Sequence, residues 1–280
     1  DYAYVRESDL HFISGPAADA ELVGGNAEQQ PAHAVFFQAP LGATSVSSPT
    51  LQGRPKYAPL SHLLTACGYW VEWTNGMENL PPFLREDFPK WPERWRFRLH
   101  ELQQRTELLG IFDPAKQTNP TQWLQDALSE RTSAGAYTQA RVMAENVVAL
   151  VILPKLAERD REAPAGVADL TADYHYDSRA PLTGTGSPGP ETPRLHQLPP
   201  LVEVVLVALD EASAARHADR TESKPPPWTE GLFEKIAEPG DLDADLRSLE
   251  DRLIADRMNA RFFRAEVVLR ASKWSRDAEL

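Results

Sequence analysis

Two apolar segments, separated by a long polar stretch, place the strongest constraint on the fold of this chain. The first covers residues 147–153, where seven apolar residues follow one another, and the second covers residues 201–209, where only Glu203 interrupts the run. Both segments are rich in branched apolar residues, and both are too short to form buried helices of ordinary length. We therefore predict two central β-strands, each covered on both faces, with Pro154 ending the first.

The intervening residues 157–200 are crowded with proline, glycine and charge. The part that reads GTGSPGPETPRLHQLPP, residues 184–200, has no periodicity and no uninterrupted stretch long enough for a helix or a strand. We expect residues 157–200 to form a polar, variable surface loop between the two strands. Within this stretch, residues 173–179 have the polar and aromatic composition of a ligand site, although such a group is more often a turn whose tyrosines pack on a sheet.

The N-terminal third has the pattern of short strands separated by turns. We predict strands at residues 8–15, 33–42 and 68–76, because apolar residues alternate there or form short buried runs. The dipeptide Asn75-Gly76 accepts positive φ angles and predicts a tight turn after the third strand.

A fourth strand is predicted at residues 94–102, where apolar and basic residues alternate. One face carries Trp95, Phe97 and Leu99, and the other carries Arg94, Arg96, Arg98 and His100. We expect the apolar face to be packed and the basic face to be wet. A row of arginines also suits an anion site, but alternating charge on a half-buried strand usually marks its solvated face.

The sequence predicts three helices and a last strand outside the two apolar segments. Residues 119–131 can form a helix capped by Asn119, residues 229–238 a short helix capped by Thr229, and residues 241–258 an amphipathic helix. Residues 260–274 then alternate again as a strand, whose one face carries Phe263, Ala265, Val267 and Leu269. These elements predict an α+β fold of antiparallel sheets with short packing helices, which forms a single domain over residues 1–280 with one or two lobes.

The composition suits a globular protein and disfavours nucleic acid as a partner. Hydrophobic residues make up 42% and aromatic residues 9% of the 280 positions, which is enough for a core. The net charge of -12 opposes binding to a phosphate backbone. No apolar run approaches the roughly 20 residues that span a bilayer, so we expect a soluble chain. Because it begins at Asp1 without a loose preamble, we expect a processed or trimmed fragment.

One glycine motif has the spacing of a dinucleotide site but not its surroundings. Gly184, Gly186 and Gly189 spell G-x-G-x-x-G, and Asp210 follows about twenty residues later. That site needs a strand before the glycines and a helix after them, whose N-terminus binds the pyrophosphate. The prolines among residues 188–200 forbid such a helix, and we predict no cofactor here.

Other partial motifs lack an essential residue. His100 begins an H-E-x-x-H pattern, but Gln104 stands where the second histidine must be. The acidic residues at 241, 243 and 245 resemble the start of a calcium loop, but Leu246 replaces its glycine. The single cysteine, Cys67, lies among apolar neighbours and is expected to be a buried, inert thiol. We predict no catalytic, cofactor-binding or metal-binding residues and no enzymatic activity.

The order of the segments resembles a family of pilin-like proteins. The sequences ARVMAENVVALVILPKL, LPPLVEVVLVALDE and RFFRAEVVLRASKWS are similar to the soluble domains of J-type minor pseudopilins of type II secretion and of type IV pilus minor subunits. The blocks RESDLHFISGPA, HAVFFQAPLG, CGYWVEW, RFRLHELQQRTE and LHQLPPLVEVVLVALDEASA resemble, in order, those of the Verru_Chthon cassette protein C family. The resemblance extends over nearly the whole chain, but its blocks are packing motifs.

The resemblance implies a structural rather than an enzymatic role. A pilin-like subunit would carry a short basic leader, a peptidase cleavage site and a long apolar helix before Asp1. This helix would anchor the subunit in the inner membrane and pack it against other pilin-like subunits in the cell envelope, with the soluble domain in the periplasm or outside the cell. The variable loop would face a partner.

The alternative is a cell-surface binding module, such as an adhesin or a carbohydrate-binding domain. It would use the aromatic residues Trp91, Trp95, Tyr174 and Tyr176 as its binding platform. The opposing interpretation is that these rings belong to the core or to a junction between lobes, because large aromatic residues are commonly buried.

Overall fold

The computed structural model describes most of the chain in fourteen segments. They are residues 8, 10–44, 50–51, 54–55, 62–79, 84, 94–113, 119–133, 135–157, 170–171, 173–179, 196–218, 224–236 and 240–272. The strands are β1 (Ile13–Pro16), β2 (His33–Ala39), β3 (Thr50–Leu51), β4 (Arg54–Pro55), β5 (Thr65–Asn75), β6 (Trp95–Gln104), β7 (Ala140–Glu145), β8 (Val147–Lys155), β9 (Tyr176–Asp177), β10 (Leu201–Leu209) and β11 (Ala260–Val268). The helices are α2 (Gln122–Ser129), α3 (Glu211–Ala218) and α4 (Asp241–Ala255), with short 3-10 turns η1 (Gly76–Asn79), η2 (Thr106–Leu108) and η3 (Gly110–Phe112).

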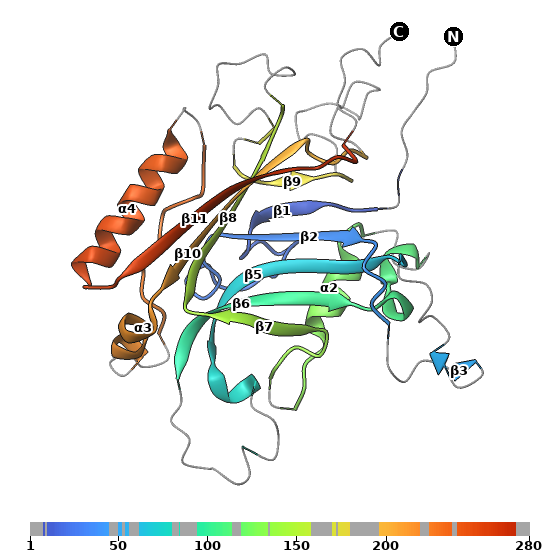
Figure 1. Ribbon diagram of the computed structural model, residues 1–280, viewed down its shortest axis with the longest axis horizontal. Coiled ribbons are helices and arrows are strands. Elements are labelled where there is room, and N and C mark those ends of the chain that lie inside the picture. The colour runs from blue at the N-terminus through green and yellow to red at the C-terminus, as the bar shows by residue number, and fades with distance from the viewer. Residues whose placement is uncertain are drawn as a thin grey trace.

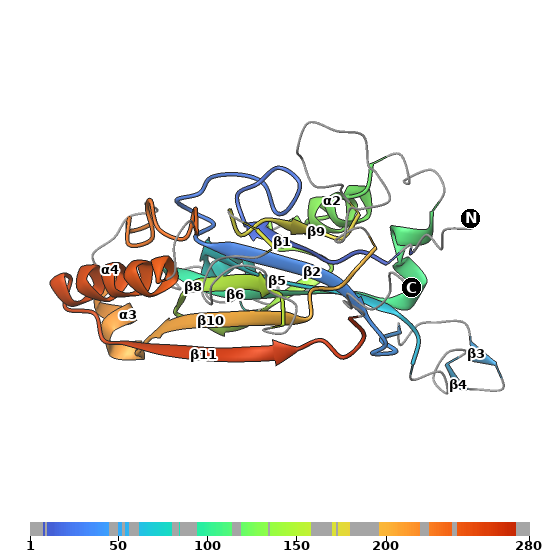
Figure 2. The same cartoon turned by 90° about the horizontal axis from the view of Figure 1, so that it is seen from above.

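The largest element is a six-stranded antiparallel sheet with the order β7-β6-β5-β2-β1-β9. Alternate residues of its strands face two different cores. On one face, Phe36 of β2 and Trp70 of β5 pack with Trp123 and Leu124 of α2. The predicted helix at residues 119–131 is thus confirmed over Gln122–Ser129, and its apolar stripe covers this face of the sheet (Figure 2).

A three-stranded antiparallel sheet, in the order β11-β10-β8, meets the opposite face of the large sheet. Its strand β8 contacts β2, β5 and β6. From β8, the strands β10 and β11 lie progressively farther from the large sheet (Figure 2). The three strands cross the long strands diagonally (Figure 1). The two sheets therefore form a corner along β8.

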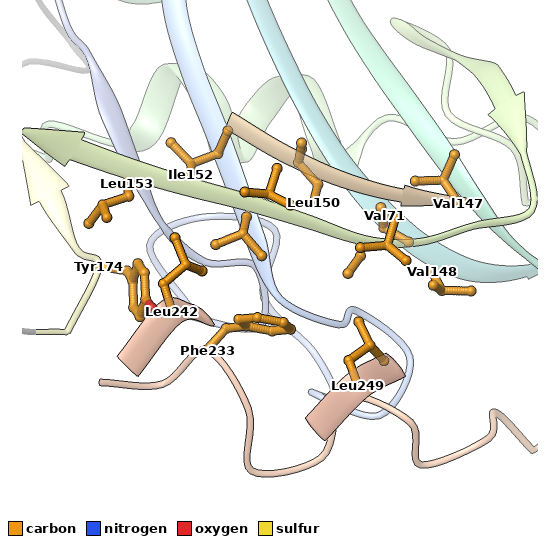
Figure 3. Close-up of a cluster of buried hydrophobic side chains, with 14 of the residues drawn as sticks. Val71, Val147, Val148, Leu150, Ile152, Leu153, Tyr174, Phe233, Leu242 and Leu249 are labelled. Carbon is orange, nitrogen blue, oxygen red and sulfur yellow. The ribbon is translucent and has the colours of Figure 1, made fainter. Parts of the chain in front are cut away.

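The second core lies on one side of this corner, where α4 covers the small sheet. Leu242 and Leu249 of α4, together with Phe233, gather below β8 near Leu153 and Tyr174 (Figure 3). These side chains are fully or almost fully buried. The amphipathic helix predicted for residues 241–258 is confirmed as Asp241–Ala255.

The two apolar segments form adjacent antiparallel strands, as predicted, but only one of them is central. β10 lies between β11 and β8, whereas β8 is the edge of its sheet. β8 is nevertheless buried on both faces, because the large sheet and α4 cover it. One face of β10 is only partly buried, so its predicted coverage on both faces is wrong. β8 also continues through Pro154, because a proline is tolerated on a strand whose outer edge needs no N–H donor.

Part of the stretch predicted as a surface loop belongs to the large sheet. β9 pairs with β1 at the edge of that sheet, and Leu170, Tyr174 and Tyr176 are buried. His11, just before β1, bonds Asp177 of β9 through Nε2 over 2.7 Å. The tyrosines therefore pack on the sheet, as expected for a turn. Residues 158–169, 172 and 180–195 lie outside the described segments.

Of three further local predictions, one is wrong. β5 ends at Asn75 as expected, and a turn follows, the 3-10 turn η1 that begins at Gly76. The described residues 229–236 form turns rather than a helix, because Phe233 has a φ angle of 61° and its N–H is bonded by Asp245. β11 forms as predicted, and both of its faces are exposed.

Candidate docking groove

An apolar groove lies on the other side of the corner between the two sheets. It has a volume of about 380 Å³. Its floor is formed by residues of β2, β5, β6 and β7 and by the residue before β1: Phe12, Val35, Phe37, Tyr69, Leu99 and Met143. Its wall is formed by residues of the small sheet and the residue after it, among them Leu150, Ile152, Val204, Leu206, Val267 and Leu269. This volume lies within the range of sites that bind small molecules or side chains of a partner.

The strand register explains why the wall is apolar. Val204 lies opposite Ile152 of β8 on one side and Ala265 of β11 on the other, and Leu206 lies opposite Leu150 and Phe263. Because directly opposed residues of antiparallel strands point to the same face, these residues form one continuous apolar surface. That surface is covered near β8 and opens toward β11, where Phe263 is 54% and Val267 43% exposed.

A polar cluster fixes the corner where the chain passes from β7 into β8. Asn146 joins the two strands with a φ angle of 65°. Its N–H bonds the carbonyl of Phe97, and its carbonyl accepts from the N–H of Leu209, so its backbone links β6 to β10. Its side-chain oxygen accepts from Nη1 of Arg96 over 3.2 Å, and its side-chain amide donates to Glu211 over 2.9 Å. One residue therefore connects both sheets.

Arg96 and Arg98 are buried rather than wet, which corrects the prediction for the basic face of β6. The guanidinium of Arg96 makes a two-pronged contact with the Glu211 carboxylate at the start of α3, with both distances 2.8 Å. This contact lowers the pKa of Glu211 through hydrogen bonds from Arg96 and then from Asn146. Nε of Arg98 donates to Glu145 over 3.0 Å. The arginines thus hold α3 and the end of β7 in place. Their guanidinium groups bind carboxylates of the protein itself rather than an external anion.

His100, on the same face of β6, is also buried and stacks on Trp70 with 5.3 Å between ring centroids. Burial, and then the charges of Arg98 and Arg131, lower its pKa to about 3. The ring is therefore neutral at ordinary pH.

His33 joins the two sheets on the other side of β8. Its Nδ1 accepts a hydrogen bond from the N–H of Ile152 over 2.9 Å, and its Nε2 donates to the carbonyl of Phe233 over 2.9 Å. Both bonds are buried and use the neutral ring. Burial lowers the pKa of His33 to about 4, against the opposing effect of the two backbone bonds.

The groove can bind apolar surface but offers no group for catalysis. All its lining residues are apolar except for the hydroxyl of Tyr69, which donates to Glu101 over 3.0 Å. Burial and then Glu101 raise the pKa of Tyr69 to about 12, so the hydroxyl stays protonated. Met143 at the rim is 58% exposed. An exposed apolar surface of this kind marks an interaction site in a soluble protein.

Three of the four aromatic residues proposed for a binding module lie within the described segments, and these three do not form a platform. Tyr174 and Tyr176 have no exposed surface, so they cannot stack on a sugar. Trp95 is half-buried and lines a cavity of about 10 Å³ with Trp73 and Trp228, which has room for little more than a water molecule. Trp91 lies outside the described residues.

The residues of the partial motifs have structural roles or lie outside the described segments. Asp210 accepts a hydrogen bond from the N–H of Ser213 in the first turn of α3, over 2.6 Å. Asp243 pairs with Arg264 over 2.7 Å and Asp245 bonds the N–H of Phe233, so these acids begin α4 instead of a calcium loop. Cys67 is buried, as predicted, and burial raises its pKa to about 11. The motif glycines at 184, 186 and 189 are not among the described residues.

The described segments contain neither a metal-binding cluster nor a membrane-spanning helix. No group of three or more His, Cys, Asp or Glu side chains among these residues is arranged to hold a metal ion. No helix within them combines the length and apolar character needed to cross a membrane.

Comparisons with protein-family models, with curated proteins and with solved structures each gave no match to this chain. The groove is thus the candidate functional site on physical grounds alone.

Proposed function

We propose that this protein is the globular part of a minor pilin-like or pseudopilin-like subunit, a non-enzymatic structural component of a type II secretion or type IV pilus-like assembly. In this proposal an apolar helix that precedes Asp1 in the full-length subunit packs into the groove and anchors the subunit in the inner membrane. The globular domain projects into the periplasm or outside the cell, where it contacts other pilin-like subunits.

The open apolar groove is the observation that carries this proposal. It lies in a corner between two sheets; its wall is a continuous apolar surface, and its floor is apolar apart from the hydroxyl of Tyr69. A helix is about 10 to 12 Å wide with its side chains, and a helix with a broad apolar face is the element that buries two such surfaces together. The resemblance of the sequence blocks to pilin-like proteins supports the same occupant.

The gene itself provides the first test. The DNA immediately before the codon for Asp1 should encode a basic leader, a prepilin peptidase site and an apolar helix of about 20 residues, with other pilin-like genes beside it. A cytosolic start, or an ordinary secretion signal joined directly to Asp1, would contradict the proposal.

A further inference from the structure

Among the described residues, nothing pairs with or covers the outer edge of β11. β11 is the last strand of the small sheet, and no residue from Phe262 to Val268 is buried. Its pairing with β10 is continuous over nine residues and has no bulge, and the strand contains no proline. Proteins usually shield such an edge with bulges, prolines or a covering segment, because its free N–H and C=O groups pair readily with another strand.

The hydrogen bonds at the two ends of the β10–β11 ladder show which groups are free. The N–H of Leu269 bonds the carbonyl of Pro200, and the N–H of Asp210 bonds the carbonyl of Asn259. Along an antiparallel pair, residues whose N–H and C=O groups point toward the partner strand alternate with residues whose groups point away from it. The odd-numbered residues of β11 therefore bond β10, whereas Phe262, Arg264, Glu266 and Val268 direct their N–H and C=O groups outward.

The side chains of β11 are complementary to a second copy of the same strand. If two copies pair antiparallel about Ala265, Arg264 of each lies opposite Glu266 of the other. In the same register Phe263 lies opposite Val267, and Phe262 lies opposite Val268. Opposite charges and aromatic–branched pairs both stabilise directly opposed positions. The two Arg264–Glu266 pairs lie next to the two-fold axis. The backbone N–H and C=O groups of both residues point outward from β11, so these pairs can form the hydrogen bonds of the new ladder.

The charged side chains of β11 have unused pairing capacity within one copy, which favours a second copy of β11 as the partner. Glu266 lies directly opposite the buried Glu203 of β10, and among the described residues it has no ion pair. Lys155 and Arg264 both contact Glu203, and Nη1 of Arg264 also pairs with Asp243. The Arg264 side chain remains 50% exposed, so it can take a further carboxylate. A second copy would supply that carboxylate and would give Glu266 a cation.

We propose that β11 pairs antiparallel with β11 of a second copy, which forms a two-fold symmetric dimer with a continuous six-stranded sheet. This inference does not depend on what occupies the groove. A symmetric interface of this kind repeats each contact twice, so the Arg264–Glu266 pair is made on both sides of the axis.

The test measures the mass of the 280-residue protein in solution by light scattering or sedimentation over a range of concentrations. Wild type should form a dimer, and Glu266→Arg should raise its dissociation constant at least about tenfold, because two attractive pairs become repulsive. Glu266→Pro should do the same, because it removes an outward N–H that the monomer does not use. Glu250→Arg, the same charge change at an exposed position of α4, should leave the dimer intact.

Amide hydrogen exchange distinguishes this interface from others. Phe262, Arg264, Glu266 and Val268 should exchange fast in the monomer and slowly in the dimer, whereas their odd-numbered neighbours should be protected in both. A monomer at concentrations up to about 1 mM would overturn the proposal. A dimer that keeps its affinity in both Glu266 variants, or that leaves these four amides unprotected, would also overturn it and would point to the groove as the interface.

Discussion

Acidification should destabilise the fold, because two buried histidines are held neutral, His33 at the corner between the sheets and His100 beside Trp70 on the face of the large sheet that α2 covers. The pKa of His33 is about 4 and that of His100 about 3 in the folded protein, against 6.5 for an ordinary histidine. The unfolded chain therefore binds more protons than the folded one below pH 6.5. The stability that each neutral ring contributes is fully present above pH 6.5 and is lost as the pH falls toward the folded pKa.

The loss of stability on acidification follows from the width of the pH range between the unfolded and the folded pKa of each histidine. Between pH 6.5 and pH 5, each histidine lowers the free energy of unfolding by about 1.4 kcal/mol per pH unit. Each therefore lowers it by about 2 kcal/mol over this range, and the two together lower it by about 4 kcal/mol. His33→Gln retains a donor for the carbonyl of Phe233 and an acceptor for the N–H of Ile152, but it cannot take up a proton. Its free energy of unfolding should fall by about 2 kcal/mol less than that of wild type over this range.

Urea unfolding followed by tryptophan fluorescence at pH 7.5 and at pH 5 measures the two free energies. The exposed His62 provides a control, because His62→Gln should leave the wild-type pH dependence unchanged. If His33→Gln lost as much stability as wild type on acidification, the neutral, buried ring of His33 would not be the source of the pH dependence.

Three further substitutions test, by urea unfolding, the packing of the large sheet under α2 and the contacts at the corner. Gly68→Ala should cost about 1 to 3 kcal/mol, because its Cβ would clash with the ring of Phe36, and an unchanged stability would show that the ring can move aside. Asn146→Ala should be less stable than Asn146→Gly by about 1 kcal/mol, because only alanine is strained at a positive φ, and equal losses would contradict this. Glu211→Gln should cost about 1 kcal/mol by weakening its largely exposed contact with Arg96, and the loss should shrink in high salt if the contact is ionic.

Local patterns predicted most of the strands but not how they are covered. β10 has the predicted bounds, and the alternation of residues 94–102 correctly predicted β6. The wet face of β6 was wrong because the acids that neutralise its arginines lie far along the chain, Glu145 before the corner and Glu211 after β10. Sequence spacing contains no signal for such pairs. Pro154 did indicate that β8 is an edge strand, because a proline that continues an apolar run is tolerated mainly at the edge of a sheet.

The sequence predicted the apolar face of β11 that continues the groove wall, but it did not predict the groove itself. The alternation of residues 260–274 placed Phe263 and Val267 on one apolar face, and the structure has them on that face. Periodicity shows which residues share a face, but it does not show whether anything covers that face. That the face is open depends on the angle at which the two sheets meet, which is set by the contacts of Asn146 and His33.

The most direct test of the proposed role is the reactivity of a thiol in the groove. Cys67 is buried with a raised pKa, so Met143→Cys adds the one accessible thiol at the groove, and Ile254→Cys places an equally exposed thiol on α4 as a control. Both thiols should react rapidly with a maleimide in the 280-residue protein. When the protein is expressed with its native preceding sequence, the thiol at 143 should become protected while that at 254 stays reactive. Equal reactivity at 143 with and without that sequence would contradict the claim that an apolar helix occupies the groove.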